Sequence, residues 1–155
     1  MPYLENEELG DQVDDIQTVN RENVKAELQK SKVTVLSVFA PRCHGCSQVE
    51  PQLASVKKHL ASEFYNKVEV VKMDINNEVF FLKNVSKTPS FLIYEKKGNY
   101  FWDLDMKFNE PLSEAEIKSN ANVIPRSEQG DALSEEDQLR QIMEVRLTEF
   151  IKKVI

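Results

Sequence analysis

The sequence predicts an α/β domain in which a mixed central sheet of four to five strands is flanked by helices. Three observations lead to this fold class. Apolar, β-branched runs alternate with segments of helical period from about residue 13 to 90, which is typical of parallel strands joined by helices. Two strand-like runs then follow each other across a short turn. The chain closes on a long amphipathic segment.

Length and composition limit the possible functions. The 155 residues, 41% of them hydrophobic and 30% charged, suffice for one soluble domain, which we expect to span residues 1–155. The formal net charge of -6 argues against a nucleic-acid partner, because such proteins usually carry a basic face. No run approaches the roughly 18 apolar residues of a membrane helix. The acidic start lacks the apolar core of a signal peptide, so we expect a cytoplasmic protein with no membrane partner.

The first half of the chain contains two predicted strands and two predicted helices. Residues 13–20 form a weak strand, and Asn20 can cap the short helix that follows. Residues 32–39, KVTVLSVF, fit a strand that is buried on both faces. Residues 43–64 then take a helical period, with Pro51 inside it. Proline removes a backbone hydrogen bond and clashes with the preceding turn, so we expect a kink there.

The second half is predicted to continue the sheet. Residues 67–75 read as a buried strand and residues 76–86 as a short helix. Residues 89–94 form a strand that opens on a proline, and residues 100–106 pair with it across the turn at 96–99.

A polar insertion at about residues 107–133 precedes the last helix. Ser113 and Glu116 can cap a short helix within it, and Ser134 with Asp137 resembles a capping box after it. The insertion is either a solvated loop or a specificity element near the substrate groove. The apolar stripe of the last helix is expected to pack in the core rather than bind a partner.

Both cysteines lie in the stretch PRCHGC, residues 41–46. Cys43 falls at a predicted strand-to-helix junction, and Cys46 follows about one helical turn later. Unpaired N–H groups and the dipole at a helix start favour the thiolate, which is the attacking species. Cys46 is then close enough to attack the sulfur of Cys43 in a mixed disulfide. The pattern therefore indicates a redox pair.

Two other interpretations of the pair stay open. The cysteines can be two buried residues without a role, although a helix start would expose Cys43. A zinc site needs about four ligands, and beyond the pair only His44 and His59 offer nitrogen. We therefore expect no metal and no organic cofactor.

A wider stretch, VLSVFAPRCHGCSQVEP, resembles the active-site segment of the thioredoxin and protein disulfide isomerase family. That segment is a strand, then F-x-A-P-W-C-x-x-C, then a proline five residues after the second cysteine, which Pro51 matches. KTPSFLIYEKKGN resembles the family's cis-proline strand and the hairpin after it, and Lys72 matches the lysine beneath the active site. The resemblance covers roughly residues 12–105 and the last helix, and it implies a thioredoxin fold.

The resemblance also implies roles for individual residues. Cys43 would be the nucleophile and Cys46 the resolving thiol of a thiol–disulfide oxidoreductase that acts on protein disulfides or dithiols. Pro89 would be cis and face the cysteines, which leaves the Thr88 backbone free to pair with an extended substrate. A thioredoxin reductase or glutathione would supply electrons, which implies a part in electron transport and cell redox homeostasis.

One departure from the family concerns the resolving step. The family's buried Asp or Glu, six residues before the first cysteine, is Ser37 here. Serine is a poor base, so we expect slow resolution by Cys46. Lys72 would also lose its acidic partner, and burial tends to remove the charge of such a lysine. The alternative is a non-catalytic adaptor or redox-sensing module that holds a partner in the groove at Thr88 and Pro89.

A second departure concerns the residues beside the nucleophile. Arg42 replaces the family's tryptophan, which also favours the adaptor, and it flanks Cys43 together with His44. Cations favour the thiolate, so we expect a Cys43 pKa below the free value of roughly 8.5. The reduction potential should then lie above thioredoxin's roughly −270 mV. Other interpretations are that Arg42 binds an acidic partner and that His44 is a solvated surface residue.

Overall fold

The computed structural model describes residues 16–120 and 134–155, so residues 1–15 and part of the predicted insertion lie outside the described residues. Five strands form one mixed sheet in the order β1-β3-β2-β4-β5, as the fold class predicted. β1, β3 and β2 run parallel, and β4 and β5 are antiparallel to their neighbours. The strands are β1 Gln17–Val19, β2 Val33–Phe39, β3 Val68–Asp74, β4 Ser90–Glu95 and β5 Tyr100–Leu104.

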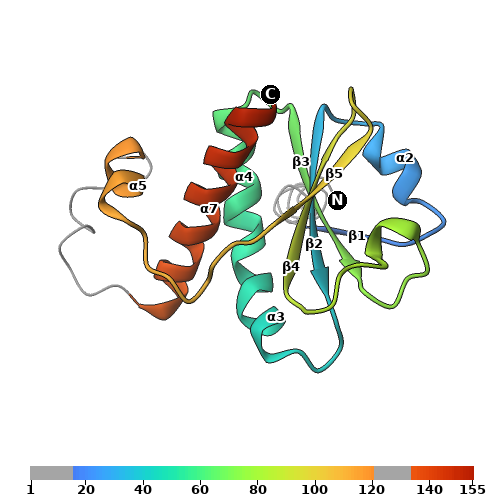
Figure 1. The fold of residues 1–155 in the computed structure, drawn as a ribbon, viewed down its shortest axis with the longest axis horizontal. Coiled ribbons are helices and arrows are strands. Elements are labelled where there is room, and N and C mark those ends of the chain that lie inside the picture. The colour runs from blue at the N-terminus through green and yellow to red at the C-terminus, as the bar shows by residue number, and fades with distance from the viewer. Residues whose placement is uncertain (1–15, 121–133) are drawn as a thin grey trace, which may run out of the picture.

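Helices cover both faces of this sheet (Figure 1). The α-helices of the described residues are α2 Val24–Leu28, α3 His44–Val49, α4 Leu53–Glu63, α5 Glu114–Ser119 and α7 Glu135–Val154. α5 lies beyond α7, away from the sheet. α4 and α7 lie side by side on one face, and α2 lies on the other. Because side chains alternate along a strand, Val33 and Val35 pack on the α4 and α7 side, whereas Leu36 and Val38 pack on the α2 side. This double burial explains why β2 is largely apolar, with Thr34 and Ser37 as its two polar residues.

The helix predicted over residues 43–64 is interrupted at Pro51. α3 ends at Val49, the 3-10 turn η1 (Glu50–Gln52) contains the proline, and α4 begins at Leu53. The expected kink is thus a change of helical type, since the proline nitrogen has no hydrogen to donate to the preceding turn. α3 consequently caps the end of the sheet toward which β2 points, while α4 runs along the face (Figure 1).

Two predicted helices are shorter than expected. Of residues 76–86, only η2 (Phe80–Leu82) is helical, as a 3-10 turn. Asp74 accepts nearby backbone and side-chain N–H groups with both its carboxylate and its carbonyl, and such local bonds compete with a helix. The Asn20 side chain likewise accepts the N–H groups of the turn that precedes α2, which begins only at Val24.

The two helix starts predicted around the insertion are present. Ser113 accepts the Glu116 N–H at 3.1 Å and the Glu116 carboxylate accepts the Ser113 N–H at 2.9 Å, a complete capping box for α5. Ser134 accepts the Asp137 N–H at 3.1 Å at the start of α7. Residues 121–133, between these helices, are not described.

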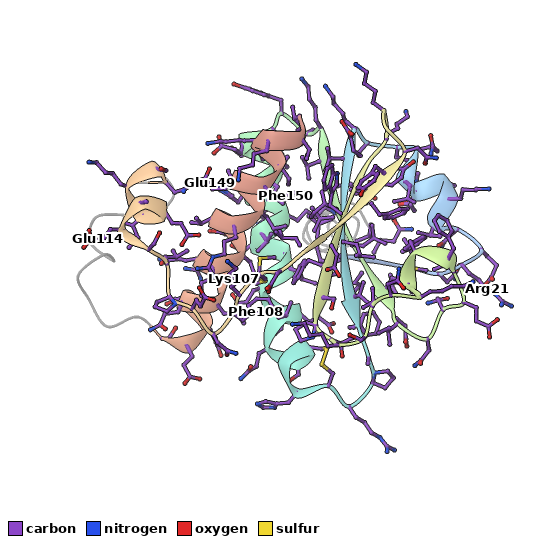
Figure 2. All side chains as sticks on the ribbon, viewed as in Figure 1. Arg21, Lys107, Phe108, Glu114, Glu149 and Phe150 are labelled. Atoms are coloured by element: carbon purple, nitrogen blue, oxygen red, sulfur yellow. A yellow bond between two sulfur atoms is a disulfide. The ribbon has the colours of Figure 1, made fainter. Side chains whose placement is uncertain are left out.

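Arg146 of α7 anchors the described part of the insertion. Its guanidinium donates to the carbonyl oxygens of Met106 and Lys107 at 2.8 and 2.7 Å, and to both carboxylate oxygens of Glu116 at 3.0 and 3.2 Å. The Arg146 side chain is only 9% exposed. Figure 2 shows Lys107 and Phe108 on the segment that crosses toward α7. A plain solvated loop therefore does not describe residues 107–120.

α7 belongs to the core, as its apolar stripe predicted. Met143, Leu147 and Ile151 are fully buried and pack in one cluster with Val56 and Leu60 of α4. Within residues 16–120 and 134–155, no helix combines the length and the apolar character needed to cross a bilayer.

Candidate active site

The cysteine pair lies where the chain passes from β2 into α3. Cys43 is the N-cap of α3, and a disulfide joins it to Cys46 with the two Cα atoms 5.2 Å apart. Figure 2 shows this bond in yellow beside α3. The Cys43 sulfur accepts the Cys46 N–H at 3.1 Å. The sulfur thus meets one of the N–H groups that a helix start leaves without a backbone partner, an arrangement that stabilises negative charge on sulfur.

The two cysteines differ in their access to solvent. Cys46 is 8% exposed, and Cys43 is half-buried. An incoming disulfide therefore meets the sulfur of Cys43 before that of Cys46.

The loop before β4 brings Thr88 and Pro89 against the cysteine pair. The Thr88–Pro89 peptide bond is cis, and the Thr88 hydroxyl donates to the Cys43 sulfur at 3.4 Å. Gly45 faces Pro89 so closely that an added Cβ would lie 2.9 Å from the Pro89 Cδ atom. The glycine inside the CHGC motif is therefore explained by the close approach of this proline.

Ser37 and Lys72 lie side by side on β2 and β3, on the face covered by α3 and α4. Ser37 is 3% exposed and the Lys72 side chain 20% exposed. Lys72 Nζ donates to Glu50 Oε1 at 2.9 Å. The expectation that Lys72 lacks an acidic partner is therefore wrong, because turn η1 supplies one from the residue before Pro51.

A small cavity of about 10 Å³ joins these groups beneath the disulfide. Its lining includes Ser37, Cys46, Glu50, Lys72 and Pro89. A volume of roughly 10–15 Å³ is the lower limit for one water molecule. The inner cysteine, the serine and the Lys72–Glu50 ion pair thus line one small cavity that opens to solvent on the Glu50 side.

Arg42 and His44 are exposed at the outer side of the site. Together with Cys43 and Glu50 they line a shallow hollow on the surface. Arg42 has a positive φ of 61°, at the turn that leads into α3. Both basic side chains therefore border the same surface hollow as the half-buried Cys43.

A family model described as thioredoxin matches residues 15–122. The chain belongs to the thioredoxin family. The first thioredoxin domain of mouse protein disulfide-isomerase A4 is similar in structure, with a TM-score of 0.53 and 20% identity over 78% of this chain and 81% of that one. The zinc-bound form of human ERp44 has a TM-score of 0.50 and 17% identity over 58% of this chain. No curated protein sequence matches the chain.

These structural relatives support the thioredoxin fold and, at such identities, the fold alone. The chain spans only 27% of the ERp44 chain. Against the thioredoxin family's active-site segment, Cys43, Cys46, Pro51 and Pro89 occupy the matching positions, and Ser37 stands where the family has its buried acid.

Glu50 is the site residue that the sequence analysis missed. It follows Cys46 by four residues, a spacing that places both on one side of a helix, and this was the available signal. His59 is not brought to the site: its Nε2 lies 3.1 Å from the Thr148 hydroxyl of α7. Across the described part of the chain, no group of three metal-ligating side chains is found.

Proposed function

We propose that the chain is a thiol–disulfide oxidoreductase that acts on protein disulfides or dithiols through Cys43 and Cys46. The observation that carries this proposal is the disulfide at the start of α3, with a half-buried outer sulfur and a buried inner one, packed against the Thr88–Pro89 loop. A structural cysteine pair would not need one cysteine to be only half-buried at a helix start.

The chemistry follows from this order of access. In the reducing direction, the Cys43 thiolate attacks a substrate disulfide, forms a mixed disulfide and displaces one substrate sulfur as a thiolate. The Cys46 thiolate then attacks the Cys43 sulfur, which releases the second substrate sulfur and leaves the Cys43–Cys46 disulfide. Two electrons pass from the cysteine pair to the substrate. A thioredoxin reductase or glutathione is the proposed donor that reduces the pair again.

The surface beside Pro89 supports a protein substrate. A hollow of about 520 Å³ extends from Pro89 along the start of β4 and the end of β5. Lys87, Asp103 and Phe108 are among its lining residues. Because Phe108 belongs to the insertion, this part of the chain can contribute to specificity. In the cytoplasm, the expected compartment, thiols are kept reduced, so the pair would act there as a reductant.

Insulin reduction with dithiothreitol as electron source tests the proposal. We expect the wild-type protein to accelerate insulin precipitation, Cys43→Ser to abolish the acceleration, and Cys46→Ser to accumulate a mixed disulfide at Cys43. A wild-type rate no higher than that of a variant in which both Cys43 and Cys46 are replaced by serine would exclude the oxidoreductase function. Trapping partners with Cys46→Ser would then identify protein substrates.

A non-catalytic adaptor is the second candidate, and Ser37 is the observation that favours it. This residue is 3% exposed beneath the cysteine pair and carries no carboxylate to help Cys46 react. An adaptor would hold partners in the groove at Thr88 and Pro89 without turnover. It would retain them when both cysteines are replaced by serine, whereas the oxidoreductase would lose its trapped substrates.

A further inference from the structure

We infer that Glu50 accepts the proton of Cys46 when this thiol resolves the mixed disulfide, and that Lys72 holds the Glu50 carboxylate in position. The inference rests on the proposed oxidoreductase function and gives its resolving step a base. The carboxylate would come from the turn after α3 rather than from position 37 in the middle of β2.

The resolving step needs a proton acceptor near Cys46. Only a thiolate attacks a disulfide, and burial disfavours the charged form of a thiol. Cys46 is 8% exposed and touches solvent only at the edge of the outer hollow, so bulk water has limited access to its proton. The buried hydroxyl of Ser37 is a poor base, and the only other ionisable side chains lining the cavity are those of Glu50 and Lys72.

Glu50 is placed to serve as that acceptor. It lies one helical turn beyond Cys46 and lines the same cavity of about 10 Å³. A space of this size is compatible with a single bridging water, which can carry a proton between the two side chains. Position 50 can therefore supply the base that position 37 lacks.

Lys72 is the positioning residue of this arrangement. The Glu50 side chain is 57% exposed and would otherwise be free to turn into solvent. Lys72 projects from β3 beside Ser37 and donates to Glu50 Oε1 at 2.9 Å. The ion pair thus keeps the carboxylate at the rim of the cavity.

The proton can also leave by way of Glu50. Glu50, like Cys46, lines both the inner cavity and the outer hollow, and its side chain is much the more exposed of the two. The charged and titratable groups around it are Lys72 from β3 and Arg42, Cys43 and His44 from the start of α3. A proton taken from Cys46 can therefore pass from the carboxylate to bulk water without crossing the core.

The step balances without another reagent. The Cys46 S–H bond breaks and an O–H bond forms on Glu50. The electron pair left on the Cys46 sulfur forms the bond to the Cys43 sulfur. The bond between Cys43 and the substrate sulfur breaks, its electron pair stays on the substrate sulfur, and that thiolate takes a proton from water. Glu50 finally loses its proton to water.

Stopped-flow reaction of the reduced protein with one equivalent of dithiobis(nitrobenzoate) tests the inference. The first release of thionitrobenzoate reports attack by Cys43, and the second, which is unimolecular, reports resolution by Cys46. For Glu50→Gln we expect an unchanged first phase and a second phase slowed about tenfold or more at pH 7, in line with general base catalysis. The second phase should also rise more steeply with pH, because hydroxide must replace the carboxylate.

Further variants separate proton transfer from a structural effect. Glu50→Asp keeps a carboxylate and should retain part of the second-phase rate, and Lys72→Met should slow only that phase. Ser37→Asp combined with Glu50→Gln should restore it by returning an acid to β2. Glu63→Gln at the far end of α4 is the matched control with the same change of charge, and it should leave both phases unchanged.

The outcomes distinguish the inference from the function on which it rests. If Glu50→Gln keeps the wild-type second phase and its pH profile, or slows both phases equally, Glu50 is not the proton acceptor, while the oxidoreductase proposal stands. If the wild-type protein releases only the first equivalent of thionitrobenzoate and never the second, Cys46 does not resolve the mixed disulfide. The oxidoreductase proposal itself then fails.

Discussion

At the scale of single residues, the site combines the half-buried Cys43 with basic side chains on the surface around it. Arg42 and His44 are both exposed and line the same hollow as Cys43. The charge of the Arg42 guanidinium acts through solvent, so its effect on the thiolate is modest and depends on the salt concentration. The Cys46 N–H and the Thr88 hydroxyl, at 3.1 and 3.4 Å from the Cys43 sulfur, act at closer range.

The reduction potential of the Cys43–Cys46 couple tests how much the surface charge and the closer hydrogen bonds each stabilise the thiolate. We expect the wild-type couple to lie above roughly −270 mV, because every one of these contacts favours the reduced, thiolate form. Arg42→Gln should lower the potential by about 5–20 mV, the equivalent of an exposed charge contact. Equilibration with glutathione buffers at low salt measures both values.

The control for this prediction is Arg21→Gln. Arg21 is also exposed, but it lies far from the disulfide in Figure 2 and pairs with Glu22 at 2.8 Å. The Arg21→Gln substitution should leave the reduction potential unchanged. High salt should reduce the effect of Arg42→Gln on that potential. A wild-type potential at or below that of thioredoxin would contradict the tuning hypothesis.

At the scale of elements, Arg146 determines how the insertion sits on the domain. The guanidinium is buried and satisfies carbonyl oxygens before α5 as well as the Glu116 carboxylate within it. Removing this side chain takes the donor from the carbonyl of buried Met106 and from the partly buried Glu116 carboxylate, which costs more than an exposed ion pair contributes.

We therefore expect Arg146→Gln to lower the free energy of unfolding by about 2–4 kcal/mol. Arg140→Gln is the matched control on the same helix, since Arg140 pairs with Asp137 at 2.7 Å but is 26% exposed. That change should cost less than about 1 kcal/mol. Urea denaturation measures both, and equal losses would show that Arg146 is no special anchor.

The same contact predicts a pH dependence of stability. The hydrogen bond from Arg146 lowers the pKa of Glu116. A carboxyl group whose pKa is lower in the folded state stabilises the fold fully at pH values above its unfolded-state pKa, about 4.3. This stabilisation is lost as the pH falls through the folded-state pKa. The stability difference between wild type and Glu116→Gln should therefore be constant near pH 7 and shrink below about pH 4. Urea denaturation from pH 7 to 3 measures it, and a difference that grows in acid would contradict the assignment.

At the scale of the whole molecule, the last helix completes the core that supports the site. Leu147 and Ile151 of α7 pack with Val56 and Leu60 of α4, which continues the helix that carries the cysteines. We expect Leu147→Ala to lower the free energy of unfolding by about 2–5 kcal/mol, as for other buried leucines.

Ile155→Ala removes apolar surface from the end of the chain and serves as the control, since Ile155 is 44% exposed. It should change stability by less than about 0.5 kcal/mol. Similar values for the two variants in urea denaturation would mean that α7 is not part of the cooperative core.

The sequence by itself determined the order of the elements, the sheet class and the position of the cysteine pair between β2 and α3. These features depend on hydrophobic period, proline positions and capping residues, which are properties of neighbouring residues. It also indicated which residues match the thioredoxin family's motif. Helix extents around Asn20 and Asp74 were predicted less well, because local side-chain hydrogen bonds compete with helical ones.

Only the tertiary structure decided which side chains meet across elements. The contact of Gly45 with Pro89, the pairing of Lys72 with Glu50 and the anchoring of the insertion by Arg146 each join segments that are far apart in the sequence. Such contacts depend on strand register and on how each helix crosses the sheet, and no local pattern encodes either. For this reason the sequence showed that position 37 lacks an acid, and the fold showed that Glu50 brings one to the same cavity.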